Sequence, residues 1–205
     1  MLKIIKKYNG GMANSYILTA DGKNAVVIDP ATPKIIDELQ KNGLVAGCIL
    51  LTHCHFDHIG GIPALKKAGA KLFCGEEEVA LVGKYELFEV AGMPPFTYTV
   101  DDKLKDNQVF DFCGIHVQTL FTPGHTQGSV CYLVTDGEKR YLFTGDTLFE
   151  DCIGRTDFPT GNALAMQQSL RRLIALEGDI PIYAGHGEDT SLDMERKYNP
   201  FIKDV

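Results

Sequence analysis

The sequence predicts an α/β sandwich in which helices cover the outer faces of two β-sheets. Strand-like runs occur in two batches along the chain, and helix-like segments follow each batch. Several runs are short, continuous and apolar, as in strands buried on both faces. The length of 205 residues and the apolar content of 44% fit one large domain, which we expect to span residues 1–205.

The first batch begins with a predicted hairpin, in which NSYILTA and NAVVIDP are joined by the turn DGK. A helix should follow, beginning at Thr32 and Pro33 and ending at Gly43. The run AGCILL is typical of a buried strand, and helical signals return in GIPALKKAG and EEEVALVG. Residues 83–100 carry aromatic residues between glycines and prolines, which predicts a loop-rich connector.

The second batch contains the strand-like runs HVQTLF, SVCYLV and RYLFTG. An amphipathic helix is predicted in ALAMQQSLRRLIALEG, with Gly178 as its stop. IPIYAG is a further strand, and a final helix should begin at Thr190 and Ser191 and end before Pro200.

Composition excludes several classes of protein. The formal net charge of −7 leaves no basic field to gather nucleic acid or anionic lipid. No run reaches the ~18 apolar residues of a membrane span, and the N-terminus lacks the apolar stretch of a signal peptide. The six cysteines show no C-x-x-C pair, which predicts a reduced, cytoplasmic protein, and we expect Cys54 and Cys152 to be packing thiols. No motif indicates an oligomeric state.

The stretch THCHFDHIGG gathers His53, His55, Asp57 and His58 into six positions. Side chains two apart on an extended chain point the same way, which places His53 beside His55 and turns Cys54 to the other side. Asp57 and His58 are adjacent and would diverge only on a turning loop. Three imidazoles and a carboxylate this close would repel and desolvate one another as mere packing residues, so the stretch indicates a metal site.

Three other runs end in the same kind of residue. HVQTLF leads through TPG to His125, RYLFTG leads to Asp146, and IPIYAG leads to His186. The five imidazoles and two carboxylates exceed what one tetrahedral zinc needs. Two metals sharing Asp146 as a bridge, ~3.5–4 Å apart, would use all seven. His116 lies away from these strand ends, and we expect it to be structural.

The motifs THCHFDH, TPGHTQGS, FTGDTLF and YAGHGEDT resemble the metallo-β-lactamase superfamily from about residue 4 onward, which implies a four-layer αβ/βα sandwich. GRTDFPTGN and ERKYNPF resemble the short glyoxalase II-like, or hydroxyacylglutathione hydrolase-like, enzymes of that superfamily. The family pattern implies that Asp146 bridges two metals. It assigns His53, His55 and His125 to one metal and Asp57, His58 and His186 to the other.

The resemblance implies a metal-dependent hydrolase that cleaves small thioesters such as S-lactoylglutathione by attack of a hydroxide between the metals. Its cofactors would be two zinc ions, with iron or manganese possible at the same ligands. Asp57 and Asp146 would be catalytic, because they orient the attacking oxygen. A thiolate has a pKa near ~8.5 and can leave without a strong general acid.

Arg155 in GRTDF corresponds to a family lysine that contacts the glutathione moiety, which predicts a substrate-binding role. Alternatively, Arg155 pairs with Asp157 or another acid as a structural bridge. Full-length glyoxalase II enzymes add a helical domain with cationic glutathione contacts, and the few residues after His186 leave no room for it. Selectivity for a glutathione thioester therefore stays open.

Other members of the superfamily provide the alternatives. Persulfide dioxygenases also resemble this chain, including GRTDF, but hold one iron and oxidise glutathione persulfide with O₂. Class B1 and B2 β-lactamases carry a cysteine ligand near the position of Asp146, so the aspartate argues against a β-lactamase. Flavodiiron oxidoreductases share the fold but need a fused flavodoxin domain, which we do not expect in this chain. A metal-binding protein without catalysis is also disfavoured, because the site would be open and able to carry out hydrolysis.

Overall fold

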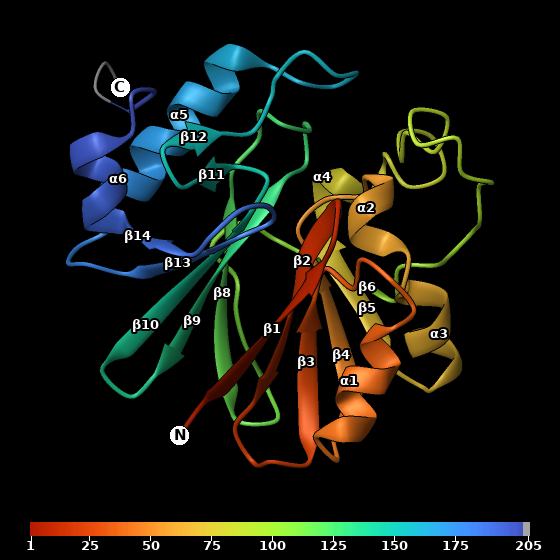
Figure 1. Ribbon diagram of the computed structural model, residues 1–205. Coiled ribbons are helices and arrows are strands. Elements are labelled where there is room, and N and C mark those ends of the chain that lie inside the picture. The colour runs from red at the N-terminus through yellow and green to blue at the C-terminus, as the bar shows by residue number, and fades with distance from the viewer. Residues whose placement is uncertain (203–205) are drawn as a thin grey trace.

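The computed structural model describes residues 1–202, which form two six-stranded sheets packed face to face (Figure 1). In spatial order, the first sheet contains β1 (Lys3–Asn9), β2 (Met12–Thr19), β3 (Asn24–Ile28), β4 (Val45–Leu51), β5 (Lys71–Gly75) and β6 (Asp102–Leu104). The second contains β14 (Thr190–Ser191), β13 (Pro181–Ala184), β10 (Lys139–Gly145), β9 (Val130–Asp136), β8 (Ile115–Phe121) and β7 (Val109–Phe112). A small hairpin of β11 (Leu148–Phe149) and β12 (Cys152–Ile153) stands apart.

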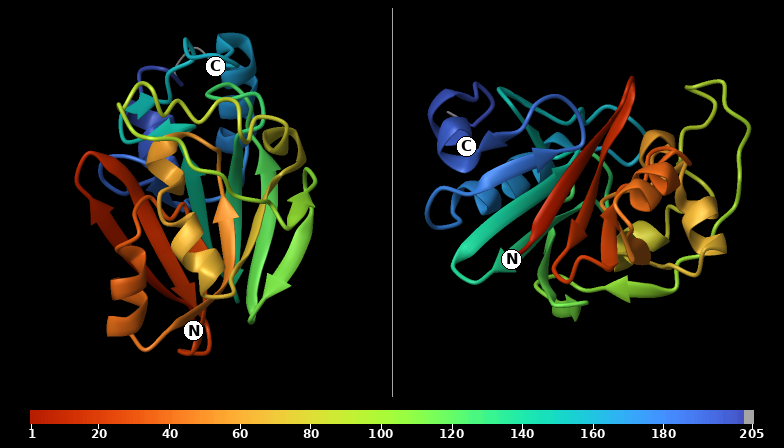
Figure 2. Two further views of the ribbon diagram at one scale, coloured as in Figure 1. Left: turned by 90° about the vertical axis from the view of Figure 1, so that its right-hand side faces the viewer. Right: turned by 60° about the horizontal axis from the view of Figure 1, so that its bottom comes forward.

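Helices lie on the two outer faces. The first half of the chain contributes α1 (Ile35–Lys41), α2 (Phe56–Ile59), α3 (Ile62–Lys67) and α4 (Glu76–Val79). The second half contributes α5 (Ala163–Ile174) and α6 (Leu192–Tyr198). Viewed from the end of the sandwich, α5 and α6 lie beyond the second sheet, whereas α1 and α3 lie beyond the first (Figure 2).

Strand direction brings several strand ends to one edge. In the first sheet, β3, β4, β5 and β6 run parallel. In the second, β9 is antiparallel to both β8 and β10, and β13 is parallel to β10. The strands β8, β10 and β13 therefore share a direction, and their carboxyl ends lie at the same edge of the sheet.

The core confirms the four-layer sandwich, because alternate residues of each strand face opposite layers. On β3, Val26 and Ile28 pack between the sheets with Tyr132 and Phe143 of the second sheet. Ala25 and Val27 instead belong to the cluster beneath α1 and α3. A third cluster joins the outer face of the second sheet to α5. It includes Leu133, Leu142, Met166, Leu170 and Leu173.

Most predicted elements are present, with differences at their ends. The DGK hairpin is confirmed by the antiparallel pairing of β2 with β3. The edge strand β1 was not predicted, since its lysine-rich sequence has little of the apolar signal of a buried strand. The prediction that Thr32 begins the first helix is wrong: the Thr32 carbonyl closes a turn with the Ile35 N–H, and α1 starts at Ile35.

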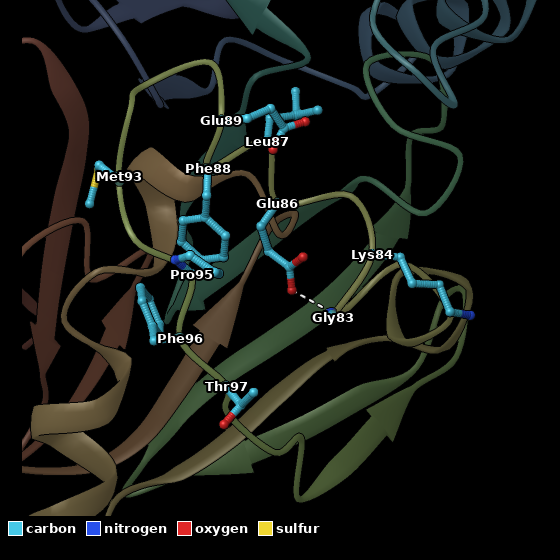
Figure 3. Close-up of a pocket in the computed structure, with 10 residues that line it drawn as sticks. All are labelled: Gly83, Lys84, Glu86, Leu87, Phe88, Glu89, Met93, Pro95, Phe96 and Thr97. Atoms are coloured by element: carbon cyan, nitrogen blue, oxygen red, sulfur yellow. Dashed lines mark hydrogen bonds between the residues drawn. The ribbon is translucent and has the colours of Figure 1, made fainter.

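The predicted connector has no regular secondary structure from residue 83 to residue 100. The rings of Phe88 and Phe96 pack edge to face at 5.1 Å, and the connector encloses a cavity of about 370 Å³ (Figure 3). Glu86 is buried there and accepts a hydrogen bond from the Gly83 N–H. Its backbone carbonyl accepts the Phe56 N–H at 2.7 Å, which fixes the connector against α2.

Within residues 1–202 the cysteines form no disulfide. Cys54 is a buried packing residue, as expected, but Cys152 is exposed on the β11–β12 hairpin, so that prediction is wrong. No helix in this part of the chain is both long and apolar enough to cross a bilayer.

Candidate metal centre

The predicted ligand residues lie just beyond four strand ends. β4 ends at Leu51 and leads into His53 and His55. In the second sheet, β8 leads through residues 122–124 to His125, β10 leads directly to Asp146, and β13 leads through Gly185 to His186. The site therefore lies between the two sheets at one edge of the sandwich (Figure 1).

His53, His55 and His125 form one cluster. The rings of His53 and His55 lie 4.6 Å apart, and Cys54 points instead into the core beneath α3. The Nδ1 atom of His55 lies 2.9 Å from the Nε2 atom of His125. One ligand atom from each of the three residues falls within 4.8 Å of the others, a spacing that could hold one ion.

Asp57, His58 and His186 form a second cluster of the same kind. Asp57 and His58 lie on α2, a single helical turn rather than the turning loop expected. Successive helical residues project about 100° apart, which lets the two side chains diverge. The His186 Nε2 atom lies 3.1 Å from the nearer carboxylate oxygen of Asp57.

Asp146 lies between the two clusters. Its Oδ1 atom is 3.3 Å from His58 Nε2, and its Oδ2 atom is 3.6 Å from His125 Nε2 and 3.5 Å from His186 Nε2. This approach requires glycine at position 185, because a Cβ there would overlap the Asp146 carboxylate.

The donor atoms of the site fit bound metal ions. Within residues 1–202, the Nε2 atoms of His53, His55 and His58 and the Oδ1 atom of Asp146 are buried without a hydrogen-bond partner. Such unsatisfied atoms are costly unless a ligand completes them. Imidazole and carboxylate donors together suit zinc, iron and manganese. His116 lies elsewhere, exposed on β8 and paired with Asp111 at 2.9 Å.

Asp29, at the end of β3, supports the site and was missed in the sequence. It is buried and accepts hydrogen bonds from Thr52 N at 2.8 Å, Thr52 Oγ1 at 2.7 Å and His58 Nδ1 at 2.9 Å. Because the Nδ1 atom donates to Asp29, the Nε2 atom of His58 faces the centre. The ring of His125 is fixed in the same way by the Arg155 carbonyl, 2.8 Å from its Nδ1 atom. The available signal was an acid ending the apolar run NAVVIDP.

Burial keeps two of the imidazoles neutral. Desolvation, reinforced by the neighbouring imidazoles, holds the pKa of His53 well below its ordinary value. The same causes, with His125 the nearest contributor, lower the pKa of His55 to about 3. Both rings therefore offer lone pairs to a metal ion at neutral pH without first losing a proton.

The other two imidazoles face carboxylates. Burial opposes the charge on His58, but Asp146 and Asp57 raise its pKa well above the ordinary value. Burial likewise opposes the charge on His186, yet hydrogen bonds to Asp146 and Asp57 raise its pKa to about 9. Burial alone would raise the pKa of Asp146. The charge on His58 outweighs burial and, with the other neighbouring imidazoles, holds that pKa well below its usual range. Metal binding here must therefore displace protons.

A cavity of about 340 Å³ opens beside the ligands. Its apolar walls are Phe56, Leu87, Val90, Phe149 and Phe158. Arg155 lies at its rim, where its Nε and Nη2 atoms each lie 2.7 Å from an oxygen of Asp157. Its guanidinium also stacks on Phe158, 3.7 Å from the ring centre. This is the pairing with Asp157 that the sequence left as an alternative.

Comparison with known proteins gives consistent matches. A family model described as the metallo-β-lactamase superfamily matches residues 8–186. Hydroxyacylglutathione hydrolase GloC of Haemophilus influenzae is 33% identical over 197 residues, covering 92% of each chain.

Solved structures share the whole fold. The BLEG-1 B3 metallo-β-lactamase has a TM-score of 0.88 and 31% identity, covering 99% of this chain and 100% of its own. TTHA1623, solved in a di-iron-bound form, has a TM-score of 0.84 and 31% identity, covering 96% and 99%. ETHE1 from Myxococcus xanthus has a TM-score of 0.78 and 27% identity, covering 97% and 83%.

Proposed function

The chain belongs to the metallo-β-lactamase superfamily, and from this premise we propose a metal-dependent hydrolase with two metal ions that cleaves small thioesters such as S-lactoylglutathione. The observation that carries the proposal is the convergence of seven ligand-type side chains on one point, several with buried, unsatisfied donor atoms. The similarity to hydroxyacylglutathione hydrolase GloC supports the choice of a thioester.

We assign His53, His55 and His125 to one ion and Asp57, His58 and His186 to the other, with Asp146 shared. Zinc is our first choice, and iron or manganese would suit the same donors. When bound, such ions supply Lewis acidity and lower the pKa of water toward ~7.

The chain's own residues complete the chemistry. In this proposal the carboxylates of Asp57 and Asp146 orient the attacking oxygen; an oxygen of each lies within 3.5 Å of His186 Nε2, at the centre of the site. The walls of the cavity beside the ligands are mainly apolar. Among the described residues, the polar groups that line the cavity are the ligands and Arg155, without a separate general acid. A leaving group that departs unprotonated, such as a thiolate, suits that lining.

The similarity to ETHE1 favours a second candidate, a mononuclear iron persulfide dioxygenase acting on glutathione persulfide. A third activity also needs testing, because the argument from Asp146 against a β-lactamase concerned classes B1 and B2. That argument did not address class B3, and the 31% identity to a B3 enzyme keeps this class as a candidate.

We place the protein in the cytoplasm, because within residues 1–202 its cysteines form no disulfide. The net charge of −7 supports a small-molecule partner rather than a nucleic acid.

One series of measurements on a single preparation tests these candidates. Protein purified without added metal is first analysed for its elements, then assayed for S-lactoylglutathione hydrolysis, cephalosporin hydrolysis, and O₂ uptake with glutathione persulfide. We expect two transition-metal ions per chain and thioester hydrolysis that disappears on metal stripping and returns on reloading. One iron per chain with O₂ uptake and no thioester cleavage would identify the dioxygenase. Cephalosporin cleavage alone would identify a β-lactamase.

A further inference from the structure

The ligands of the first cluster come from two loops that belong to different sheets. His53 and His55 follow β4 of the first sheet, and His125 follows β8 of the second. One backbone hydrogen bond joins these loops directly, from Val130 N to Thr52 O at 3.0 Å. The distance between the two loops decides whether the three imidazoles can reach one ion.

Glu78 lies between these two loops. It is the third residue of α4, which follows β5, and its side chain is fully buried. Its Oε1 atom accepts the Cys54 N–H at 2.7 Å, between His53 and His55. Its Oε2 atom accepts the Thr126 hydroxyl at 2.7 Å, one residue beyond His125. A single carboxylate therefore holds the neighbours of all three imidazoles.

The backbone around Glu78 is packed as closely as its side chain. A Cβ at Gly128 would overlap the backbone nitrogen of Glu78, so the loop that carries His125 rests directly on α4. Thr126 is held further by Ser129, whose Oγ atom lies 2.7 Å from the Thr126 hydroxyl. Because these contacts are close-packed, a change at Glu78 should shift the position of His125.

A buried carboxylate is a poor choice for filling space alone. Removing its charge from water is costly, and an apolar side chain of similar volume would pack at less expense. Both hydrogen-bond partners described above are neutral donors, so Glu78 gains no ion pair from them. What it gains is a fixed separation between two loops, which an apolar side chain could not supply.

We propose that Glu78 is a positioning residue for the metal centre, which holds the His53–His55 loop and the His125 loop at the separation that one ion requires. This inference rests on the proposed metal-dependent function but not on its substrate. Without the carboxylate, the Val130–Thr52 backbone bond still joins the loops, but Cys54 and Thr126, the direct neighbours of the imidazoles, are no longer held across them.

The test compares zinc affinity in three variants, measured by competition with a chromophoric chelator. Glu78→Ala removes both contacts and should weaken zinc binding ~10–100-fold, as loss of a group that orients ligands typically does. Glu78→Gln should stay within a few-fold of wild type. Its amide oxygen can accept the Cys54 N–H while its NH₂ donates to Thr126, whose own hydroxyl turns to Ser129.

Glu195→Ala is the matched control. Glu195 is as buried as Glu78 and likewise accepts neutral donors, Asp151 N at 3.0 Å and the Thr190 hydroxyl at 2.7 Å. These partners lie outside the two loops, so its loss should lower the free energy of unfolding of the metal-free protein and leave zinc affinity unchanged.

The proposal fails if Glu78→Ala binds zinc as tightly as wild type while being destabilised like Glu195→Ala, since Glu78 would then be structural only. If Glu78→Ala does not fold, Glu78→Asp replaces it, because a side chain shorter by one methylene cannot reach both loops. Wild-type affinity in a folded Glu78→Asp variant would overturn the proposal equally. Wild-type protein that binds two zinc ions but cleaves no thioester would refute the proposed function alone.

Discussion

Replacing Asp29 by asparagine should weaken metal binding by changing the tautomer of His58. One oxygen of Asp29 accepts the Thr52 N–H, and the other accepts both the Thr52 hydroxyl and the Nδ1–H of His58. An asparagine must keep its oxygen on the Thr52 N–H, because its NH₂ would face another donor there. The NH₂ then faces His58 Nδ1, which must become an acceptor. The ring proton moves to Nε2, the atom turned toward Asp146.

The structure indicates the size of this effect. A protonated Nε2 cannot bind a metal ion, so His58 must adopt its less favoured tautomer or leave its hydrogen bond. Loss of such a partner typically costs ~10–100-fold in metal affinity, or about 1.4–2.7 kcal/mol. The shape of the side chain is unchanged, so the loss should not arise from a cavity.

Two measurements check this prediction. Zinc competition titration gives the affinity, and the ¹⁵N chemical shifts of the His58 ring report its tautomer in the metal-free protein at a pH above the raised pKa of His58, where the ring is neutral. Asp21→Asn provides the control, since it makes the same chemical change in the exposed turn before β3, away from the ligands. Asp29→Asn with wild-type zinc affinity, or with the proton still on Nδ1, would refute the reasoning.

Other substitutions and a change of pH test other parts of the site. Asp146→Ala should lower turnover by orders of magnitude. His116 is exposed, so His116→Ala should keep the turnover of wild type and change the free energy of unfolding by under ~0.5 kcal/mol. Comparable turnover in both folded variants would contradict this prediction. Arg155→Ala should raise KM for anionic thioesters more than for neutral ones, with Asp157→Ala acting in the opposite sense; equal effects on both substrates would make Arg155 structural. In the metal-free protein, His186 has a pKa raised to about 9, so its stabilising contribution is complete below pH 6.5 and is lost as the pH rises through 9. The free energy of unfolding of the metal-free protein, measured with denaturant below pH 6.5 and above pH 9, should show that loss. Equal free energies at the two pH values would exclude a stabilising contribution from His186.

The positions of the candidate ligands were predictable because they follow from strand direction. An apolar run that ends in a ligand-type residue places that residue at the carboxyl edge of its sheet, and strands of one direction share that edge. His125, Asp146 and His186 all follow this rule in the second sheet. The alternation of His53, Cys54 and His55 is likewise a local property of extended chain.

Asp29 and Glu78 were harder to predict: the acid that ends the apolar run NAVVIDP was the one signal for Asp29, and no pattern indicated Glu78. Asp29 precedes a proline, which is typical of a turn, and Glu78 is the last of three consecutive glutamates, which is typical of a solvated helix face. Their partners lie far away in sequence, 23 to 48 positions along the chain. A local pattern shows which residue types are present, but burial of one acid among several depends on how α4 rests against the second sheet.

The two clusters differ in how strongly they need a metal ion, and this difference bears on the choice between hydrolase and dioxygenase. His53 and His55 are held neutral by burial and keep unsatisfied Nε2 atoms, so protein groups alone leave the first cluster incomplete. In the second cluster, only the Nε2 atom of His58 is unsatisfied within residues 1–202, because His186 and Asp57 lie 3.1 Å apart and satisfy one another as an ion pair. An ion entering there must first displace the proton of His186, which becomes easier as the pH approaches 9. On the proposed assignment, occupancy of the second cluster is the quantity that separates the two reactions, and we expect it to depend on Asp57, His58 and His186.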